Sequence, residues 1–359
     1  MTEQEYLKHF ANGNFPVGKA CPEDTVWHNA RKAPFRIYGA CDTGIPFRRI
    51  PLDKTEGLSS GGVILSSHTT GMRVRFVTDS AYVSVKAKEP YAGFSHNMTV
   101  AGYLGFDLYA DQSHVKALVP PVGYHGFSDV LELSDTYISY AMMPKGLHTV
   151  TLFLPLYAEV WELEIGLSPN AVLQAPPPYT YENPIGFYGS SIVHGATASA
   201  PGNTYPAMIS RMLDADILNL ALSGHAFGED AIAEYIASLS LSAFVYDYDH
   251  NAPTAEHLAN THERMFRIIR KAQPNLPIIM ATRPSCSDSA ERKARSSVVE
   301  ATYRRAKEAG DSLVWYIPGE TFFAPYGEEN CVEDGTHPND LGFYAMANAF
   351  LPILKAVLK

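Results

Sequence analysis

At mid-chain the sequence reads IGFYGSSIVHG over residues 185–195. An apolar run that suits a buried strand ends at Gly189, and two serines open the next segment. Doubly wound α/β proteins expose functional groups where a strand ends and the chain turns away from the sheet. The stretch therefore predicts a strand of a parallel sheet, with Ser191 at its carboxyl end.

The chain after this stretch alternates short apolar runs with helical patterns. The apolar runs have the composition of strands that are buried on both faces. We expect strands over 217–222, 243–249, 277–282 and 313–317, and helices over 204–213, 229–239, 255–272, 290–309 and 339–358. This alternation predicts an α/β fold, a doubly wound parallel sheet whose carboxyl strand ends lie at one edge.

The first half of the chain has the pattern of β structure. Runs of alternating, β-branched or aromatic residues are separated by turn residues. We expect strands over 72–77, 82–87, 105–109, 136–140, 148–154 and 160–165. Short strands without intervening helices predict an antiparallel β-sandwich or jelly roll. A proline-rich stretch over 168–184 then predicts a boundary between a sandwich domain, 1–175, and an α/β domain, 176–359.

Composition narrows the class of protein. The chain has 359 residues, of which 18% are charged, and a formal net charge of −10. The acidic balance argues against nucleic acid and anionic membrane as partners. No apolar run is long enough to span a bilayer, and the first residues lack the pattern of a secretion signal. We therefore expect a cytoplasmic protein; whether it forms a homo-oligomer is left open.

The cysteines and histidines do not indicate a metal site. Cys21, Cys41, Cys286 and Cys331 are scattered along the chain without paired spacing. The histidines likewise lack the spacing of zinc ligands. Reduced thiols are favoured over disulfides, and neither a metal nor a cofactor is predicted.

Four segments at predicted strand ends carry groups suited to ester chemistry. A serine such as Ser191 is a weak nucleophile and needs a histidine as base and a carboxylate to orient that base. Asp334 and His337 lie three residues apart and could supply both groups. Gly224 and Asn251 follow two of the strands, where a backbone N–H and a side-chain amide could stabilise an oxyanion. Each residue alone also has a structural explanation, such as a turn or a helix cap.

In combination, these residues resemble the SGNH hydrolases, also called GDSL-type esterases and lipases, from about residue 184 to the C-terminus. The first, second, third and fifth blocks of the family correspond to Gly189-Ser190-Ser191, Gly224, Asn251, and Asp334 with His337. The resemblance implies a flavodoxin-like sheet with Ser191 as nucleophile, His337 as general base and Asp334 as its orienting carboxylate. It also implies an oxyanion hole made of the N–H groups of Ser191 and Gly224 and the side chain of Asn251.

Two positions depart from the family pattern. Ser190 replaces the usual aspartate of the first block, and the third block reads Asp249-His250-Asn251-Ala252 instead of Gly-X-Asn-Asp. The catalytic residue types survive both changes, so the departures concern the subfamily and the local hydrogen bonds. Two other residues are further candidates. His194, three residues after Ser191, is a minor alternative base, and Arg283, after the predicted strand over 277–282, could contact the substrate or the catalytic loop.

A second resemblance lies in the first half. Gly105-Phe106-Asp107-Leu108-Tyr109 is similar to the Gly-X-Asp-Leu-Tyr signature of the β-sandwich that precedes some bacterial SGNH domains, as in two-domain carbohydrate acetyl esterases. The alternative is a strand in which Phe106 and Leu108 face one layer while Asp107 caps a turn. With either explanation we expect the sandwich beside the active-site edge, where small-molecule pockets form.

These resemblances imply a metal-independent serine esterase that removes acetyl or another short acyl group from a carbohydrate, through an acyl-enzyme. An acyltransferase, in which a sugar or natural-product hydroxyl replaces water, would use the same residues and stays open. A carbohydrate-binding protein with an inactive hydrolase domain is a third alternative, against which the intact set of catalytic residues argues. The sequence leaves the natural substrate, the acyl length and any contact between sandwich and substrate open.

Overall fold

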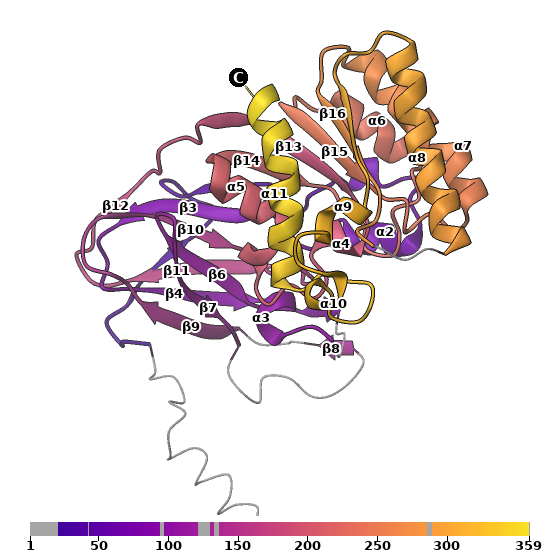
Figure 1. Ribbon diagram of the computed structural model, residues 1–359. Coiled ribbons are helices and arrows are strands. Elements are labelled where there is room, and N and C mark those ends of the chain that lie inside the picture. The colour runs from indigo at the N-terminus through magenta and orange to yellow at the C-terminus, as the bar shows by residue number, and fades with distance from the viewer. Residues whose placement is uncertain are drawn as a thin grey trace, which may run out of the picture.

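The computed structural model describes residues 21–41, 43–93, 97–120, 130–132, 136–285 and 289–358. The first residues and Cys286, on which the predictions about secretion and thiols partly rest, lie outside these ranges. Antiparallel strands come first along the chain and parallel strands second (Figure 1), which confirms the predicted fold class. Within the described ranges, no helix has both the length and the apolar character needed to cross a membrane.

The first half forms two larger antiparallel sheets. One sheet has the strand order β1-β11-β4-β9, and the other has the order β12-β3-β10-β6-β7 with β2 beside β3; β5 and β8 pair separately. The strands are β1 (Val26–Asn29), β2 (Arg36–Tyr38), β3 (Arg73–Thr78), β4 (Tyr82–Lys88), β5 (Tyr91–Gly93), β6 (Phe106–Ala110), β7 (Ser113–Leu118), β8 (Val130–Glu132), β9 (Tyr137–Met142), β10 (His148–Phe153), β11 (Glu162–Leu167) and β12 (Leu173–Gln174). Three short helices accompany them: η1 (Leu52–Lys54), α2 (Ser60–Leu65) and α3 (Val100–Tyr103).

Alternation along β3 explains how the sandwich contacts the second half. Val74 and Phe76 belong to the apolar core between the two sheets. Because successive side chains of a strand point to opposite faces, Arg73 and Arg75 lie on the other face. Both arginines are nevertheless buried, at 0% and 5% exposure, because the second half of the chain covers that face.

The second half forms a five-stranded parallel sheet with the order β14-β13-β15-β16-β17. In chain order this is 2-1-3-4-5, the arrangement of flavodoxin-like folds. The strands are β13 (Tyr181–Gly189), β14 (Ala215–Asn219), β15 (Ala243–Asp247), β16 (Ile278–Ala281) and β17 (Val314–Ile317). Strands β14 and β15 end three and two residues earlier than predicted, because the chain turns away from the sheet at Asn219 and at Asp247.

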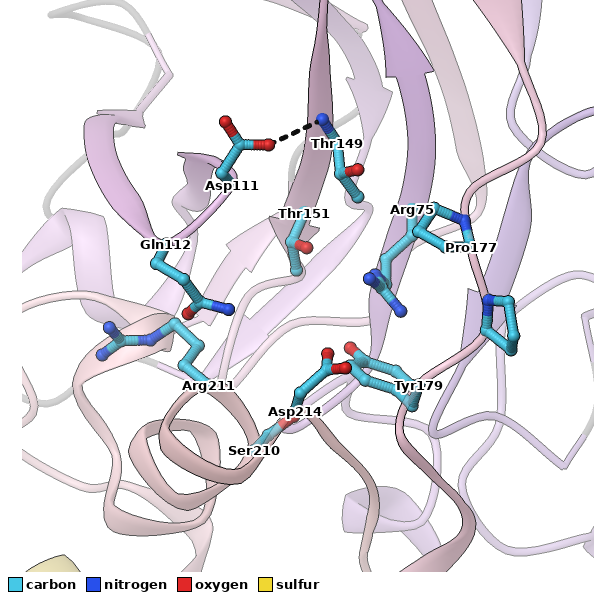
Figure 2. A pocket seen from close by; sticks show the side chains of 11 residues that line it. Arg75, Asp111, Gln112, Thr149, Thr151, Pro177, Tyr179, Ser210, Arg211 and Asp214 are labelled. Carbon is cyan, nitrogen blue, oxygen red and sulfur yellow. Dashed lines mark hydrogen bonds between the residues drawn. The ribbon is translucent and has the colours of Figure 1, made fainter.

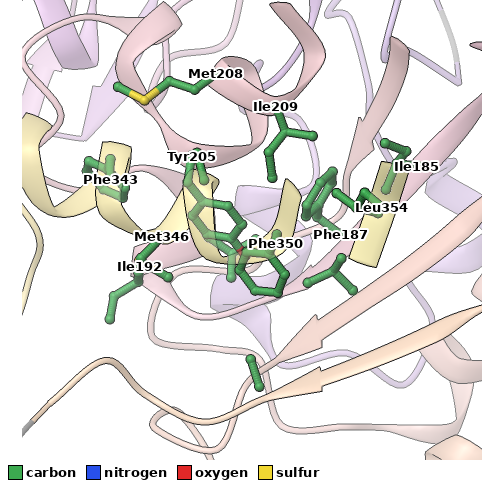
Figure 3. Packing of buried hydrophobic residues seen from close by; sticks show 14 of the residues in the cluster. Ile185, Phe187, Ile192, Tyr205, Met208, Ile209, Phe343, Met346, Phe350 and Leu354 are labelled. Atoms are coloured by element: carbon green, nitrogen blue, oxygen red, sulfur yellow. The ribbon is translucent and has the colours of Figure 1, made fainter. Parts of the chain in front are cut away.

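Helices cover both faces of the parallel sheet. Helices α5 and α11 pack on one face, where the rings of Tyr205 and Phe350 stack at 5.3 Å (Figure 3). Helices α6, α7 and α8 cover the other face, through residues such as Leu258 and Val299. The helices are α4 (Ser191–His194), η2 (Pro201–Asn203), α5 (Tyr205–Leu213), α6 (Asp230–Ser238), α7 (Ala255–Ala272), α8 (Ala290–Glu308), α9 (Glu320–Phe323), α10 (Glu328–Cys331) and α11 (Asp340–Val357).

The two halves share buried apolar contacts. Leu156 of the first half belongs to the core on the α5 and α11 face, and Ile50 and Leu65 belong to the core on the opposite face. The division into domains at residue 175 therefore stays a prediction about independent folding.

Candidate active site

The turn that carries Ser191 is fixed by close backbone contacts. A Cβ at Gly189 would lie 2.0 Å from the carbonyl oxygen of Asp247, so only glycine fits there. The N–H of Ser190 donates to the same carbonyl at 3.2 Å. The Ser190 side chain accepts from the N–H of Ile192 at 3.2 Å. Ser190, which replaces the family's aspartate, thus caps the short helix α4, at whose first position Ser191 stands.

Ser191, His337 and Asp334 form a continuous set of hydrogen bonds. The hydroxyl of Ser191 lies 2.8 Å from Nε2 of His337, although the two residues are 146 positions apart. Nδ1 of His337 lies 2.7 Å from Oδ2 of Asp334. This geometry allows the imidazole to take the proton of the hydroxyl while the carboxylate holds the ring.

The loop around Asp334 keeps its carboxylate charged. Burial raises the pKa of Asp334, but hydrogen bonds from the backbone and ring of His337, together with one from the N–H of Thr336, lower it to about 2. The two backbone N–H groups, of His337 and Thr336, lie 2.8 and 3.0 Å from Oδ1. The helix cap that follows is Asn339, whose side chain accepts from the N–H of Gly342 at 3.1 Å. Asp334 and His337 are therefore free of the capping role considered from the sequence.

Gly224 and Asn251 lie at the same edge of the sheet as Ser191. The N–H of Leu222 donates to the carbonyl of Gly189 at 3.0 Å, which brings the Gly224 loop beside the serine turn. Gly224 has a φ of +71°, a left-handed conformation that favours glycine. Oδ1 of Asn251 is buried and has no hydrogen-bond donor among the described residues. The place of both residues near the serine rests on the order and direction of the strands that precede them.

The two further candidates occupy different positions. Arg283 contacts the catalytic loop: its Nη2 donates to the carbonyl of Gly335 at 3.3 Å and to the hydroxyl of Thr336 at 3.2 Å. The ring nitrogens of His194 instead face the carbonyls of Ala221 and Leu156, at 3.2 and 2.8 Å. Burial holds the pKa of His194 well below its ordinary value. Both ring nitrogens therefore contact backbone carbonyls, and neither is placed to accept the proton of the Ser191 hydroxyl.

The first half supplies contacts that the sequence did not predict. Arg49 is fully buried and donates to four backbone carbonyls, those of Leu65, His68, Asn219 and Ala221. Asn219 and Ala221 lie at the carboxyl end of β14, so this guanidinium fixes the strand end that leads to Gly224. No signal in the sequence distinguishes Arg49 from a surface arginine.

Other side chains of the first half reach the same edge. The hydroxyl of Thr70 donates to the carbonyl of His194 in α4 at 2.6 Å. The hydroxyl of Tyr157 donates to Oγ of Ser223, next to Gly224, at 2.9 Å. Nδ2 of Asn97 donates to Oδ2 of Asp334 at 2.8 Å. The sandwich therefore adjoins the Ser191 site, as expected.

Asp107 had a sequence signal through the Gly-X-Asp-Leu-Tyr pattern. Phe106 and Leu108 lie in the sandwich core, as the alternation predicts. Asp107 does more than cap a turn: its Oδ2 accepts from the N–H of Gly202 at 3.0 Å, in the second half of the chain. The motif thus helps to join the two halves.

The described residues contain no group of three or more His, Cys, Asp or Glu side chains arranged to hold a metal ion. The groups gathered at Ser191 are instead a hydroxyl, an imidazole and a carboxylate, a combination that suits acyl chemistry at a carbonyl carbon.

Comparisons with protein families agree with a hydrolase that acts on esters. The profile of the GDSL-like lipase/acylhydrolase family matches residues 182–355. The profile of the Gly-X-Asp-Leu-Tyr region, the N-terminus of SGNH hydrolase-type esterases, matches residues 25–173. The two matched regions together span most of the chain. They show that the protein is an esterase-type hydrolase. It belongs to the SGNH, or GDSL-like lipase/acylhydrolase, family and carries that N-terminal region, which confirms both predicted resemblances.

Solved structures share the arrangement of both halves. A protein described as a GDSL-like lipase from Bacteroides ovatus is 25% identical, with a TM-score of 0.78 over 93% of this chain and 99% of its own. The salicylyl-acyltransferase SsfX3 from a tetracycline biosynthetic pathway is 20% identical, with a TM-score of 0.73 over 94% and 98%. An acetyl xylan esterase, Est2A from the rumen bacterium Butyrivibrio proteoclasticus, is 13% identical, with a TM-score of 0.62 over 92% and 98%. No curated protein matches the sequence.

Proposed function

We propose that this hydrolase is a serine esterase that removes acetyl or another short acyl group from a carbohydrate, through an acyl-enzyme formed on Ser191. The observation that carries the proposal is the hydrogen-bonded series from the Ser191 hydroxyl through His337 to Asp334, at 2.8 and 2.7 Å. A neutral hydroxyl becomes a useful nucleophile when a positioned base accepts its proton.

In the proposed reaction, Ser191 Oγ attacks the ester carbonyl while its proton moves to Nε2 of His337. The N–H groups of Ser191 and Gly224 and the side chain of Asn251 donate to the oxyanion of the tetrahedral intermediate. His337 then gives its proton to the leaving alcohol as the C–O bond breaks. Water, deprotonated by His337, attacks the acyl-enzyme, and the acid leaves as Ser191 regains its proton.

The substrate class rests on fold likeness. One structural neighbour is an acetyl xylan esterase, which supports an acetylated carbohydrate as the first substrate to test. The contacts from Tyr157 and Asn97 bring the sandwich to the edge that carries Ser191. We infer that residues of both halves surround the alcohol part of the ester.

An acyltransferase is the second candidate. The observation in its favour is the likeness, over 94% of this chain, to a salicylyl-acyltransferase. The same nucleophile and base serve both reactions, and only the acceptor of the acyl group differs.

The test compares 4-nitrophenyl acetate with acetylated xylo-oligosaccharides as substrates for the wild type, Ser191→Ala and Ser190→Ala. We expect Ser191→Ala to lose a thousandfold or more in kcat on both substrates, on the order seen when a serine nucleophile is removed. The neighbouring Ser190→Ala, which loses a helix cap, should be affected far less. Full activity in Ser191→Ala, or a larger loss in Ser190→Ala, would refute this assignment. Acyl transfer to an added alcohol at the expense of hydrolysis would favour the transferase.

A further inference from the structure

A cavity of about 350 Å³ lies between the sandwich and the second half, and none of Ser191, Gly224, Asn251, Asp334 and His337 lines it. Its walls come from β3, β10, the turn between β6 and β7, the segment before β13 and the end of α5 (Figure 2). Cavities of this size are typical of small-molecule sites and form preferentially between domains. The cavity is therefore a candidate for a second site, separate from the chemistry.

Arg75 is the unusual group in this cavity. Its side chain points into the space from β3 (Figure 2), and the residue is only 5% exposed. Its Nε and Nη1 atoms are buried without a hydrogen-bond acceptor in the described part of the chain. The guanidinium carbon lies 3.9 Å from the ring centre of Tyr179, which gives a cation–π contact but no acceptor. A buried cation with unused donors is unfavourable unless an anion or another acceptor joins it.

Arg73, two residues earlier on the same face of β3, shows the contrast. It forms an ion pair with Asp216 and donates to the hydroxyl of Tyr179 at 2.7 Å and to the carbonyl of Gly71 at 2.9 Å. The fold thus partners one buried arginine with protein groups, whereas Nε and Nη1 of Arg75, whose side chain points into the cavity, lack an acceptor among the described residues.

Arg211 adds a second guanidinium. It lies in the last turn of α5, where Nη2 donates to the carbonyl of Gly202 at 3.0 Å. Its guanidinium carbon lies 4.5 Å from the ring centre of Tyr109. Its Nε is buried without an acceptor among the described residues. Both arginines that line this cavity therefore have N–H donors without an acceptor among the described residues.

The acidic residues of the cavity already accept hydrogen bonds from the protein. Asp111 accepts from the N–H of Thr149 at 3.0 Å and lies 2.8 Å from Nδ1 of His148. Asp214 accepts from the N–H and the hydroxyl of Thr180, at 3.0 and 2.7 Å. Both carboxylates thus have protein donors, whereas Arg75 and Arg211 keep N–H groups without an acceptor among the described residues, and cationic donors of this kind suit an oxyanion.

We propose that this cavity binds a small ligand that carries an oxyanion, a carboxylate or a phosphate, with Arg75 and Arg211 as its donors. The Tyr179 ring offers an apolar wall and the hydroxyls of Thr149 and Thr151 offer polar contacts, a combination that fits the ring and hydroxyl groups of an acidic sugar. The inference does not depend on ester hydrolysis, because no residue of the Ser191 site takes part in it.

The first experiment titrates the full chain with inorganic phosphate, with glucuronate, and with glucose as the uncharged match of glucuronate, by isothermal titration calorimetry. We expect an anion to bind at least tenfold more tightly than glucose. Binding of glucuronate alone would indicate a carboxylated sugar, and binding of phosphate would indicate a phosphate group. Binding of neither anion at tens of millimolar, or equal binding of glucose and glucuronate, would overturn the proposal.

The second experiment repeats the titration with variants. Arg75→Gln and Arg211→Gln should each weaken anion binding about tenfold to a hundredfold, because each loses hydrogen bonds from a charged donor. Arg267→Gln, on an α7 side chain that is 73% exposed, is the matched control and should bind like the wild type. Ser191→Ala should also bind normally, which separates this site from the esterase site even if the proposed activity is absent. Unchanged binding in both cavity variants would overturn the proposal, and Arg211→Gln keeps the test decisive if Arg75→Gln does not fold.

Discussion

The second half of the chain supplies the groups that face Ser191, whereas the first half supplies hydrogen bonds behind them. Ser191, His337 and Asp334 contact one another from the end of β13 and the loop before α11. Arg49 and Thr70, from the sandwich, are both 0% exposed and hold the backbone of the strand end and of α4. The difference implies that removing a group that faces Ser191 should lower activity with little change in stability, whereas removing a buried supporting group such as Arg49 should mainly lower stability.

After the loss of the Ser191 hydroxyl, the largest effect on activity is expected for Asn251→Ala. If Asn251 donates to the oxyanion, its loss should lower kcat about a hundredfold to a thousandfold with little change in KM. The melting temperature should stay close to that of the wild type, because Oδ1 of Asn251 has no donor to lose among the described residues. Steady-state kinetics and thermal unfolding measure both. Asn251→Asp keeps the size but loses the donor and should be similarly slow; a change in KM alone would instead indicate a contact with the bound ester.

Arg49→Met, unlike Asn251→Ala, should lower stability strongly and kcat less. Four carbonyls would lose their donor in a buried place, so the free energy of unfolding should fall by about 3 kcal/mol or more. Since the end of β14 would loosen, we also expect kcat to fall about tenfold, a smaller loss than that of an oxyanion donor.

Urea unfolding and kinetics on the same samples check the Arg49 prediction. Arg36→Met, at an exposed position of β2, is the matched control and should change neither quantity. A stable Arg49→Met enzyme with normal kcat would break the contrast between the two halves.

Tyr157→Phe tests a single hydrogen bond between the halves. It removes the donor to Ser223, beside Gly224, and leaves the ring in place. One such bond contributes about 0.5–1.5 kcal/mol, so we expect kcat to fall about twofold to tenfold. Ser223→Ala should act similarly, and the double variant should be no slower than either single one. Additive effects in this cycle would show that the two side chains act independently.

The sequence pointed to Ser191, Asp334 and His337, which the structure brings together, because these residues lie in short local patterns. Asp334 and His337 are three residues apart, and Ser191 follows a strand that ends at a glycine. The fold class followed from periodicity, since strands and helices leave different patterns. The predicted limits of β14 and β15 were too long, because the apolar run continues after the chain has left the sheet.

The supporting groups could not be predicted in the same way. Arg49 lies in an irregular segment and bonds to carbonyls 170 and 172 positions later, so its burial depends on how the two halves pack. The open donors of Arg75 likewise follow from the register of β3 and from the position of α5. Asp107 had a sequence signal within a five-residue pattern, but its contact with Gly202 across the two halves was not foreseen.

The smallest expected effect is the pH dependence of stability that arises from the charge of Asp334. It tests which half of the chain controls that charge. The pKa of this carboxyl falls from 3.8 to about 2 in the folded protein, where the main lowering contribution comes from hydrogen bonds donated by His337. A carboxyl with a depressed pKa stabilises the fold above its ordinary pKa, and this contribution is lost as pH falls through the folded value. The unfolding free energy of the wild type relative to Asp334→Asn should therefore be level above about pH 5 and decline between about pH 4 and pH 2. Because the Asp334 side chain is 31% exposed, the decline should not exceed about 1 kcal/mol. Urea unfolding of both proteins across this pH range measures the decline.

A second variant, Asn97→Ala, removes the sandwich's contact with Asp334. If the local loop sets the charge of Asp334, the pH range of the decline should be the same in this variant as in the wild type. A narrower pH range in Asn97→Ala would show that the first half also lowers the pKa of Asp334. The contrast between the two halves would then fail at this residue.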